Sequence, residues 1–163
     1  MKPRKAELLM VRFGWLVVMA IWPIFSAANL VGDTRESEQK DRDAVAQAKD
    51  TEGRLKAYLD LAETRLKTLL LAARKLDKDG SQTASEGFRT AVTSAEDCIA
   101  KDQADKNYKK LVTQLHKAMQ KYNFALLHAL DKAAEDFRKY IQSAYEVSQR
   151  VQDGTDIQLA HYK

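Results

Sequence analysis

Apolar residues recur every three or four positions along most of this chain, and this spacing predicts amphipathic helices rather than strands. A first helical stretch runs from about residue 33 to 77. Residues 33–43 are almost wholly polar, which indicates a solvated helical stalk ahead of a helical bundle domain over 44–153. The apolar positions that follow the stalk are Ala44, Ala48, Thr51, Leu55, Tyr58/Leu59, Ala62, Leu66, Leu69, Ala73 and Leu76.

A turn is predicted at Lys78-Asp79-Gly80-Ser81, because Asp-Gly is a turn signal and glycine readily adopts the left-handed conformation that closes a helix. Thr83 or Ser85 can then cap a second helix, with Glu86 completing a capping box after Thr83. The second helix ends in the polar run 101–107. Its apolar positions are Ala84, Phe88, Ala91, Ala95 and Cys98/Ile99.

The last helical stretch is predicted from about residue 106 to 153, where Asp153-Gly154 ends it and residues 154–163 form a tail. Its apolar face continues over some six heptads. The residues of that face are Tyr108, Leu111, Leu115, Ala118, Tyr122, Leu126, Ala129, Ala133, Phe137, Tyr140, Ala144, Val147 and Val151.

The helix lengths constrain the fold. At about 1.5 Å per residue, the three stretches measure about 67, 30 and 70 Å, so an unbroken third helix would overshoot the first. Either it breaks near 123–131 and folds back as a four-helix bundle, or copies of the chain cover the exposed apolar face in a homo-oligomer. The overshoot also predicts a partner interface, formed by Phe124, Leu127, Leu130, Tyr140, Tyr145 and Val147.

An uncharged segment of 20 residues, 13–32, follows a basic start at residues 1–12. About 20 apolar residues span a bilayer as a helix, and the excess of Lys and Arg before the segment keeps the N-terminus in the cytoplasm. We therefore expect a transmembrane signal-anchor that contains Trp15, Trp22 and Pro23. The protein would be single-pass in the bacterial inner membrane, with its C-terminal domain in the periplasm.

A cleaved signal peptide is the alternative for this segment. Leu16–Ile21 would form its apolar region, and Ser26-Ala27-Ala28 offers small residues for a peptidase. The product would be a secreted helical binding protein.

The net charge of +4 lies mostly in the N-terminal segment. Residues 1–32 hold four Lys or Arg against one Glu, and the remaining residues hold 23 against 22. Binding of nucleic acid requires a concentrated basic field, so no nucleic-acid partner is expected. One local group of lysines is noted as a solvated helix face or a contact for an anionic headgroup or acidic partner: Lys101, Lys106, Lys109, Lys110, Lys117 and Lys121, against Asp102 and Asp105.

Motifs for catalysis or cofactors are missing from the sequence. It has no His-Glu-x-x-His, Cys-x-x-Cys or glycine-rich phosphate loop, so we expect no enzyme activity and no cofactor. The single cysteine, Cys98, is expected to be a small buried apolar residue. His116 and His128 are expected to be structural or surface residues, with a helical cofactor or metal carrier as the alternative.

Four short stretches of the sequence match a family pattern: Asn107, Tyr108, Leu111 and Leu115; Phe137 to Ile141; Ala91 to Ala95; and Leu55-Lys56 with Asp60-Leu61. In these residues and in its layout the chain resembles the LemA family of membrane-anchored bacterial proteins. The resemblance implies a membrane helix followed by a three- or four-helix bundle and brings no catalytic site with it. Where that family has Pro-Asn, this sequence has Ala62-Glu63-Thr64.

The sequence therefore predicts an all-α protein: a single N-terminal transmembrane helix followed by an elongated antiparallel three- or four-helix bundle or coiled coil. Its expected role is that of a non-catalytic accessory or scaffolding subunit of a membrane or envelope protein complex. The expected partners are the membrane and other membrane or envelope proteins.

Overall fold

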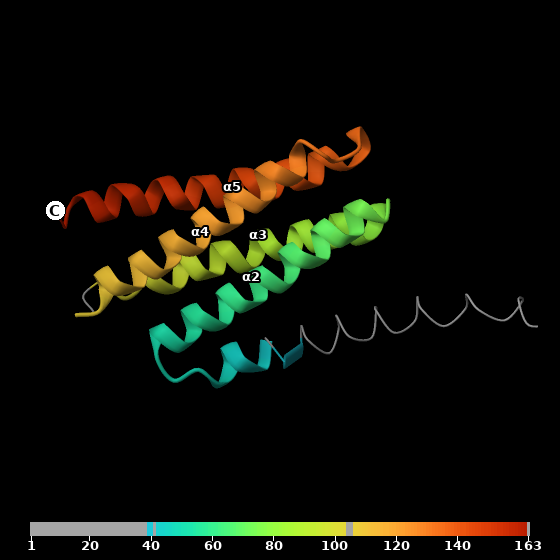
Figure 1. Cartoon of the computed structure of the whole chain (residues 1–163). Helices are drawn as coiled ribbons and strands as arrows, with labels where there is room; N and C mark the ends of the chain where they lie inside the picture. The colour runs from blue at the N-terminus through green and yellow to red at the C-terminus, as the bar shows by residue number, and fades with distance from the viewer. Residues whose placement is uncertain (1–38, 41, 104–105, 163) are drawn as a thin grey trace, which may run out of the picture. The chain divides into compact units, whose positions relative to one another are not determined.

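The computed structural model describes residues 39–40, 42–103 and 106–162. Within these ranges all regular structure is helical, which confirms the predicted all-α class and helical bundle there. A short helical stretch at 42–47 precedes four long helices (Figure 1). These are α2 (Thr51–Arg74), α3 (Lys78–Ala100), α4 (Tyr108–Leu130) and α5 (Glu135–Ala160).

The predicted membrane segment, with Trp15, Trp22 and Pro23, lies outside the described residues, as does most of the predicted stalk. Among the helices that can be described, none is both long enough and apolar enough to cross a bilayer.

The four helices form two antiparallel hairpins, α2–α3 and α4–α5, that pack side by side (Figure 1). Glu52 pairs with Lys110 and Glu63 with Lys121, so α2 and α4 run in the same direction. Contacts from Ser85 to Tyr140 and from Glu96 to Arg150 give α3 and α5 the same parallel relation. The helices are thus antiparallel within each hairpin, and the two main contacts between hairpins, α2 with α4 and α3 with α5, are parallel.

One hydrophobic core joins the hairpins. The Phe88 ring of α3 meets the Tyr122 ring of α4 edge to face, with centroids 5.6 Å apart. The Tyr122 hydroxyl donates a 2.8 Å hydrogen bond to the backbone oxygen of Leu59 in α2. Burial raises the pKa of Tyr122 strongly, so the hydroxyl stays protonated. The largest fully buried side chains include Leu55, Leu69, Phe88, Ile99, Leu111, Leu115, Met119, Leu126 and Ile141.

The turn between α2 and α3 differs from the prediction at Gly80. Leu76 takes the left-handed conformation, with φ of 58°. The Asp77 amide donates to Ala72 O at 3.0 Å and the Leu76 amide to Ala73 O at 3.3 Å, which is the Schellman closure of a helix. Asp77 also caps α3, because its carboxylate accepts from the Gly80 amide at 2.9 Å. Gly80 therefore lies in the first turn of α3, and the predicted caps Thr83 and Ser85 lie further inside that helix.

The first predicted helix is also interrupted, at residues 48–50. Asp50 begins α2 as its N-cap, and its side chain accepts a 2.7 Å hydrogen bond from the Gly53 amide. Gly53 thus lies in the first turn of α2, where its amide donates to the cap.

The last predicted helix breaks and folds back, as the four-helix alternative expects, and the break at 131–134 begins at the last residue of the predicted region 123–131. Ala134 is extended at the start of α5, and the acidic residues Glu135 and Asp136 occupy the first turn, where negative charge is favourable. The predicted stop at Gly154 is wrong, since α5 continues through it to Ala160 and buries Thr155. Packing of the final turns keeps this glycine helical.

Candidate functional site: the outward face of helix α4

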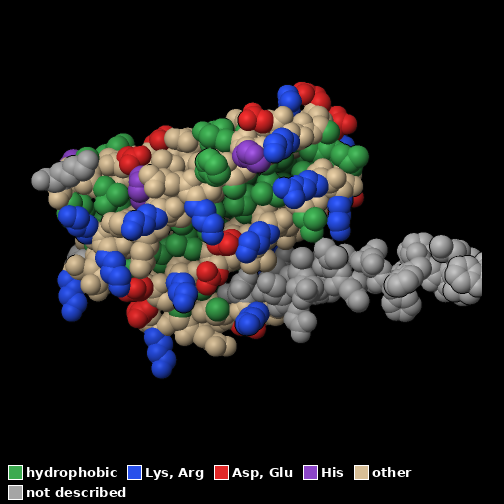
Figure 2. Space-filling model, viewed as in Figure 1, with side chains coloured by type: hydrophobic (Ala, Val, Ile, Leu, Met, Phe, Trp, Pro, Cys, Tyr) green, Lys and Arg blue, Asp and Glu red, His purple; other side chains and the backbone are tan. Residues whose placement is uncertain are grey.

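Most of the large apolar residues of the bundle are buried, but two side chains on the outward face of α4 are not. Phe124 is 77% exposed and Leu127 is 47% exposed. Figure 2 shows hydrophobic side chains at the surface on this side of the molecule, among many Lys and Arg side chains. Exposed apolar residues grouped together mark contact surfaces more often than scattered ones do.

Exposed residues spaced three or four apart lie above one another on a helix. On α4 they form one stripe along the helix, here called the α4 stripe: Lys110, Lys117, Lys121, Phe124, Leu127 and His128. Helix α4 carries no Asp or Glu at all. The α4 stripe is therefore basic in its first half and apolar in its second.

Two carboxylates of α2 neutralise part of this charge. Lys110 Nζ lies 2.7 Å from Glu52 Oε1, and Lys121 Nζ lies 2.8 Å from Glu63 Oε2. Lys67 also pairs with Glu63, at 3.0 Å.

The pKa values of both carboxyls respond to these contacts. The hydrogen bond from Lys121, followed by that from Lys67, lowers the pKa of Glu63. The hydrogen bond from Lys110 lowers the pKa of Glu52. Both groups are carboxylates at neutral pH and tie α2 to α4.

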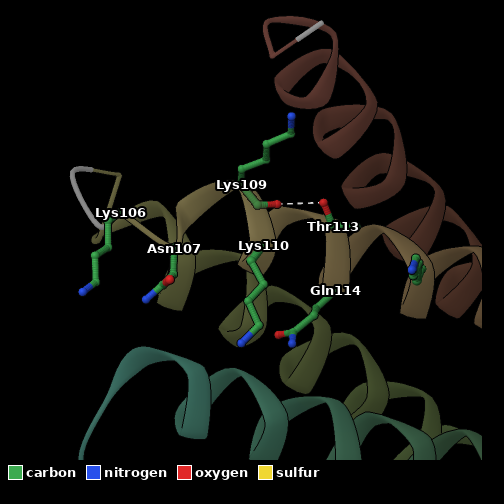
Figure 3. A pocket seen from close by; sticks show the side chains of 7 residues that line it. Lys106, Asn107, Lys109, Lys110, Thr113 and Gln114 are labelled. Atoms are coloured by element: carbon green, nitrogen blue, oxygen red, sulfur yellow. Dashed lines mark hydrogen bonds between the residues drawn. The ribbon is translucent and has the colours of Figure 1, made fainter.

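A hollow open to solvent lies beside the start of α4. Lys106, Asn107, Lys110 and Gln114 extend from the side of α4 that faces α2, whereas Lys109 points away (Figure 3). Lys109 Nζ instead lies 5.7 Å from the centre of the Tyr162 ring. We call this hollow the basic hollow; its lining residues are Lys106, Asn107, Lys109, Lys110, Thr113, Gln114 and Lys117.

The other residues of the predicted interface are less exposed. Leu130, Tyr140, Tyr145 and Val147 are half-buried and pack against the core. They lose the exposure expected from an overshooting helix because α5 folds back onto α3 and α4. Phe124 and Leu127 are the members of the predicted set that stand out from the surface.

The two histidines do not share a site. His116 is half-buried between α4 and α5, with Nδ1 3.1 Å from Thr155 Oγ1 and 3.5 Å from Asp156 Oδ1. His128 is exposed on the α4 stripe. In the part of the chain that the structure describes, no group of three or more His, Cys, Asp or Glu side chains is placed to hold a metal ion.

Cys98 is half-buried rather than buried, and its thiol lies 3.8 Å from the backbone oxygen of Thr51. Burial raises the pKa of the Cys98 thiol, which keeps it protonated and weakly nucleophilic.

A polar layer between α4 and α5 is not predicted by the sequence pattern. Asn123 is only 5% exposed, and its Nδ2 donates a 2.7 Å hydrogen bond to Gln152 Oε1. Tyr145 and Gln149 extend the layer through a 3.1 Å hydrogen bond. The predicted apolar face includes Tyr122 but not the adjacent Asn123, so the pattern did not indicate that Asn123 is buried.

Comparisons with known proteins give no identification: no family model, curated protein or solved structure matches this chain. The resemblance to the LemA family stays a prediction.

Proposed function

We propose that this protein is a membrane-anchored, non-catalytic accessory or scaffolding subunit of a membrane or envelope complex, and that Phe124 and Leu127 contact its protein partner. The observation that supports this most is the 77% exposure of Phe124 on a bundle whose other phenylalanines in the described residues are buried. Keeping a phenylalanine ring in water forgoes the favourable burial of its apolar surface, unless a partner covers it.

The geometry of the α4 stripe agrees with this role. Phe124 and Leu127 lie one turn apart on a helix held on both sides, by α5 and by the ion pairs to α2. A rigid helix presents such side chains to a partner with little loss of conformational freedom, which favours binding. The membrane anchor in the proposal comes from the uncharged segment 13–32.

The test is co-purification of the full chain from membranes in mild detergent, followed by mass spectrometry. The double variant Phe124→Ser/Leu127→Ser should lose at least one protein that the unchanged chain recovers. Truncating a central apolar contact of an interface costs about 2 kcal/mol or more, which is at least about a thirtyfold loss of affinity.

Ile157→Ser is the matched control, because Ile157 is also an exposed apolar residue, at 65%, but lies on a different helix, α5. It should recover the same proteins as the unchanged chain. Identical recovery by all three chains would rule out the proposed contact.

A further inference from the structure

We infer that the basic hollow docks on the phosphate groups of anionic phospholipids, so that this end of the bundle rests on the membrane. This inference rests on the proposed function, because it needs the anchor at 13–32 to hold the bundle near a bilayer. It assigns the basic hollow to lipid and leaves the apolar half of the α4 stripe to the protein partner.

The lining of the hollow carries this inference. Four of its seven residues are lysines, and the other three are neutral and polar: Asn107, Thr113 and Gln114. Glu52 engages Lys110 from α2 and Lys109 points away towards Tyr162, so Lys106 and Lys117 supply the remaining positive charge inside the hollow and Lys109 adds charge beside it. Ammonium groups pair well with phosphate, while the open shape suits a surface of headgroups better than an enclosed small molecule.

An aromatic pair, the buried Tyr108 and the exposed Tyr162, lies beside Lys109 near the start of α4. Tyr108 and Tyr162 have ring centroids 6.5 Å apart, and Tyr162 is 43% exposed with the Lys109 ammonium near its ring. Tyrosine is enriched where a protein meets the headgroup region, because its ring is apolar and its hydroxyl is polar. Lysine beside tyrosine therefore fits the interface between lipid and water.

The direction of the chain agrees with this placement. The Glu52–Lys110 ion pair puts the start of α2 at the same end of the bundle as the hollow. Helix α2 therefore begins at the lysine-rich end of the bundle. Attraction to an anionic surface fades within about 8 Å at physiological salt, so the hollow must lie close to the headgroups to act.

The experiment uses the full chain reconstituted in vesicles of zwitterionic phospholipid, with or without anionic phosphatidylglycerol. In a Cys98→Ser background, Thr113→Cys carries a fluorophore that headgroup-linked nitroxides quench on contact. Thr90→Cys is the matched label site, since both threonines donate to the carbonyl four residues earlier but Thr90 lies on α3. Only the label at Thr113 should be quenched, and only when anionic lipid is present.

Charge is tested with the triple variant Lys106→Gln/Lys109→Gln/Lys117→Gln. Each lost lysine should lower the ratio of docked to undocked bundle about fivefold, since a lysine near an anionic surface contributes about 1 kcal/mol. The control Lys75→Gln/Lys78→Gln/Lys132→Gln changes the net charge equally, using exposed lysines at the opposite turns, and should leave quenching unchanged.

The outcomes separate cleanly. The inference is overturned if the label at Thr113 is not quenched, or if it is quenched equally in both lipid mixtures. Absence of quenching is also the result expected if the hollow binds an acidic protein, because these vesicles contain no protein other than the reconstituted chain. Binding of inorganic phosphate by the chain without any quenching in anionic vesicles would show that free phosphate, not lipid, is the ligand, and would also overturn the inference. If the chain does not float with vesicles of either lipid mixture in a density gradient, it has no membrane anchor. That result overturns the proposed function rather than this inference alone.

Discussion

Leu76 shows how a single backbone conformation decides where α2 ends. A leucine in the left-handed region brings its Cβ close to the following carbonyl, which costs about 1 kcal/mol or more, whereas glycine avoids that contact. Leu76 is also 65% exposed, so its side chain gains little from packing.

We therefore expect Leu76→Gly to raise the free energy of unfolding by about 1 kcal/mol in urea denaturation. Lys75→Gly is the control: Lys75 has φ of −84°, so glycine there should lower stability. Equal effects of the two substitutions would contradict the left-handed assignment.

Two other glycines should respond to alanine in opposite directions. A Cβ at Gly154 would meet nothing closer than Glu96 Oε1 at 4.0 Å, so Gly154→Ala should stabilise α5 by about 1 kcal/mol through helix propensity. At Gly80 a Cβ would lie 2.2 Å from Asp77 Oδ2 and displace the cap of α3.

Thermal unfolding of both variants tests this pair. Gly80→Ala should lower stability by about 1 kcal/mol, the usual value of an N-cap. A loss of stability in Gly154→Ala would argue that α5 stops at Gly154, as the sequence pattern indicated.

At the scale of elements, the parallel contact between α2 and α4 depends on lysine–carboxylate pairs at its edge. The pKa of Glu63 is lowered, chiefly by Lys121, so the folded state prefers the carboxylate. A lowered pKa adds stability at pH values above the ordinary glutamate pKa, and this stability is lost as pH falls through the folded pKa.

We expect Glu63→Gln to reduce the loss of stability on acidification, with the change confined to the region at and below the ordinary glutamate pKa. Urea denaturation across a pH series measures it. Glu146→Gln, on the exposed side of α5, is the control for the loss of one carboxyl group. If the free energy of unfolding falls equally on acidification in the unchanged chain and in both variants, Glu63 has no structural role of this kind.

At the scale of the whole described bundle, one core serves both hairpins. Phe88 is fully buried in α3 and contacts Tyr122 of α4, which in turn is bonded to Leu59 of α2. Loss of the Phe88 ring would open a cavity bordered by both hairpins.

Phe88→Ala should lower the free energy of unfolding by about 3–5 kcal/mol. Amide hydrogen exchange should then report weaker protection in α4 as well as in α3, because the hairpins share the core. Unchanged protection of α4 would show that the hairpins are stable independently, contrary to this expectation.

How far the sequence predicts the fold can be judged at its turns. The apolar repeat of three and four residues correctly indicates helical structure in the first, second and last predicted stretches, although the predicted bounds, such as 33–77 for the first helix, differ from the observed α2 at Thr51–Arg74. The ends of the helices were predicted less well. Gly80 and Gly154 belong to strong turn signals but are helical, whereas the turns at Leu76 and Asp131 contain no glycine or proline. Local propensities are worth about 1 kcal/mol, and core packing outweighs them.

The candidate site divides in the same way. Phe124 and Leu127 were predicted from the apolar pattern, and the lysines of α4 from composition. The position at which the last helix folds back decided which of these residues share one exposed stripe. It also decided that Leu130, Tyr140 and Val147 are half-buried. The exposure of a side chain depends on which other helices pack against it, and the apolar pattern along one helix does not contain that information.

By itself, the sequence determined that the chain from residue 51 onward forms amphipathic helices. The α-helix is the regular backbone conformation that places apolar residues spaced three and four apart on one face, where they can be buried together. Tertiary structure alone decided that α2 runs parallel to α4, that α5 returns at 131–134, and which aromatic side chains stay in water. Those choices depend on contacts between residues more than fifty positions apart, such as Tyr122 and Leu59, and each is settled by the burial of a shared core.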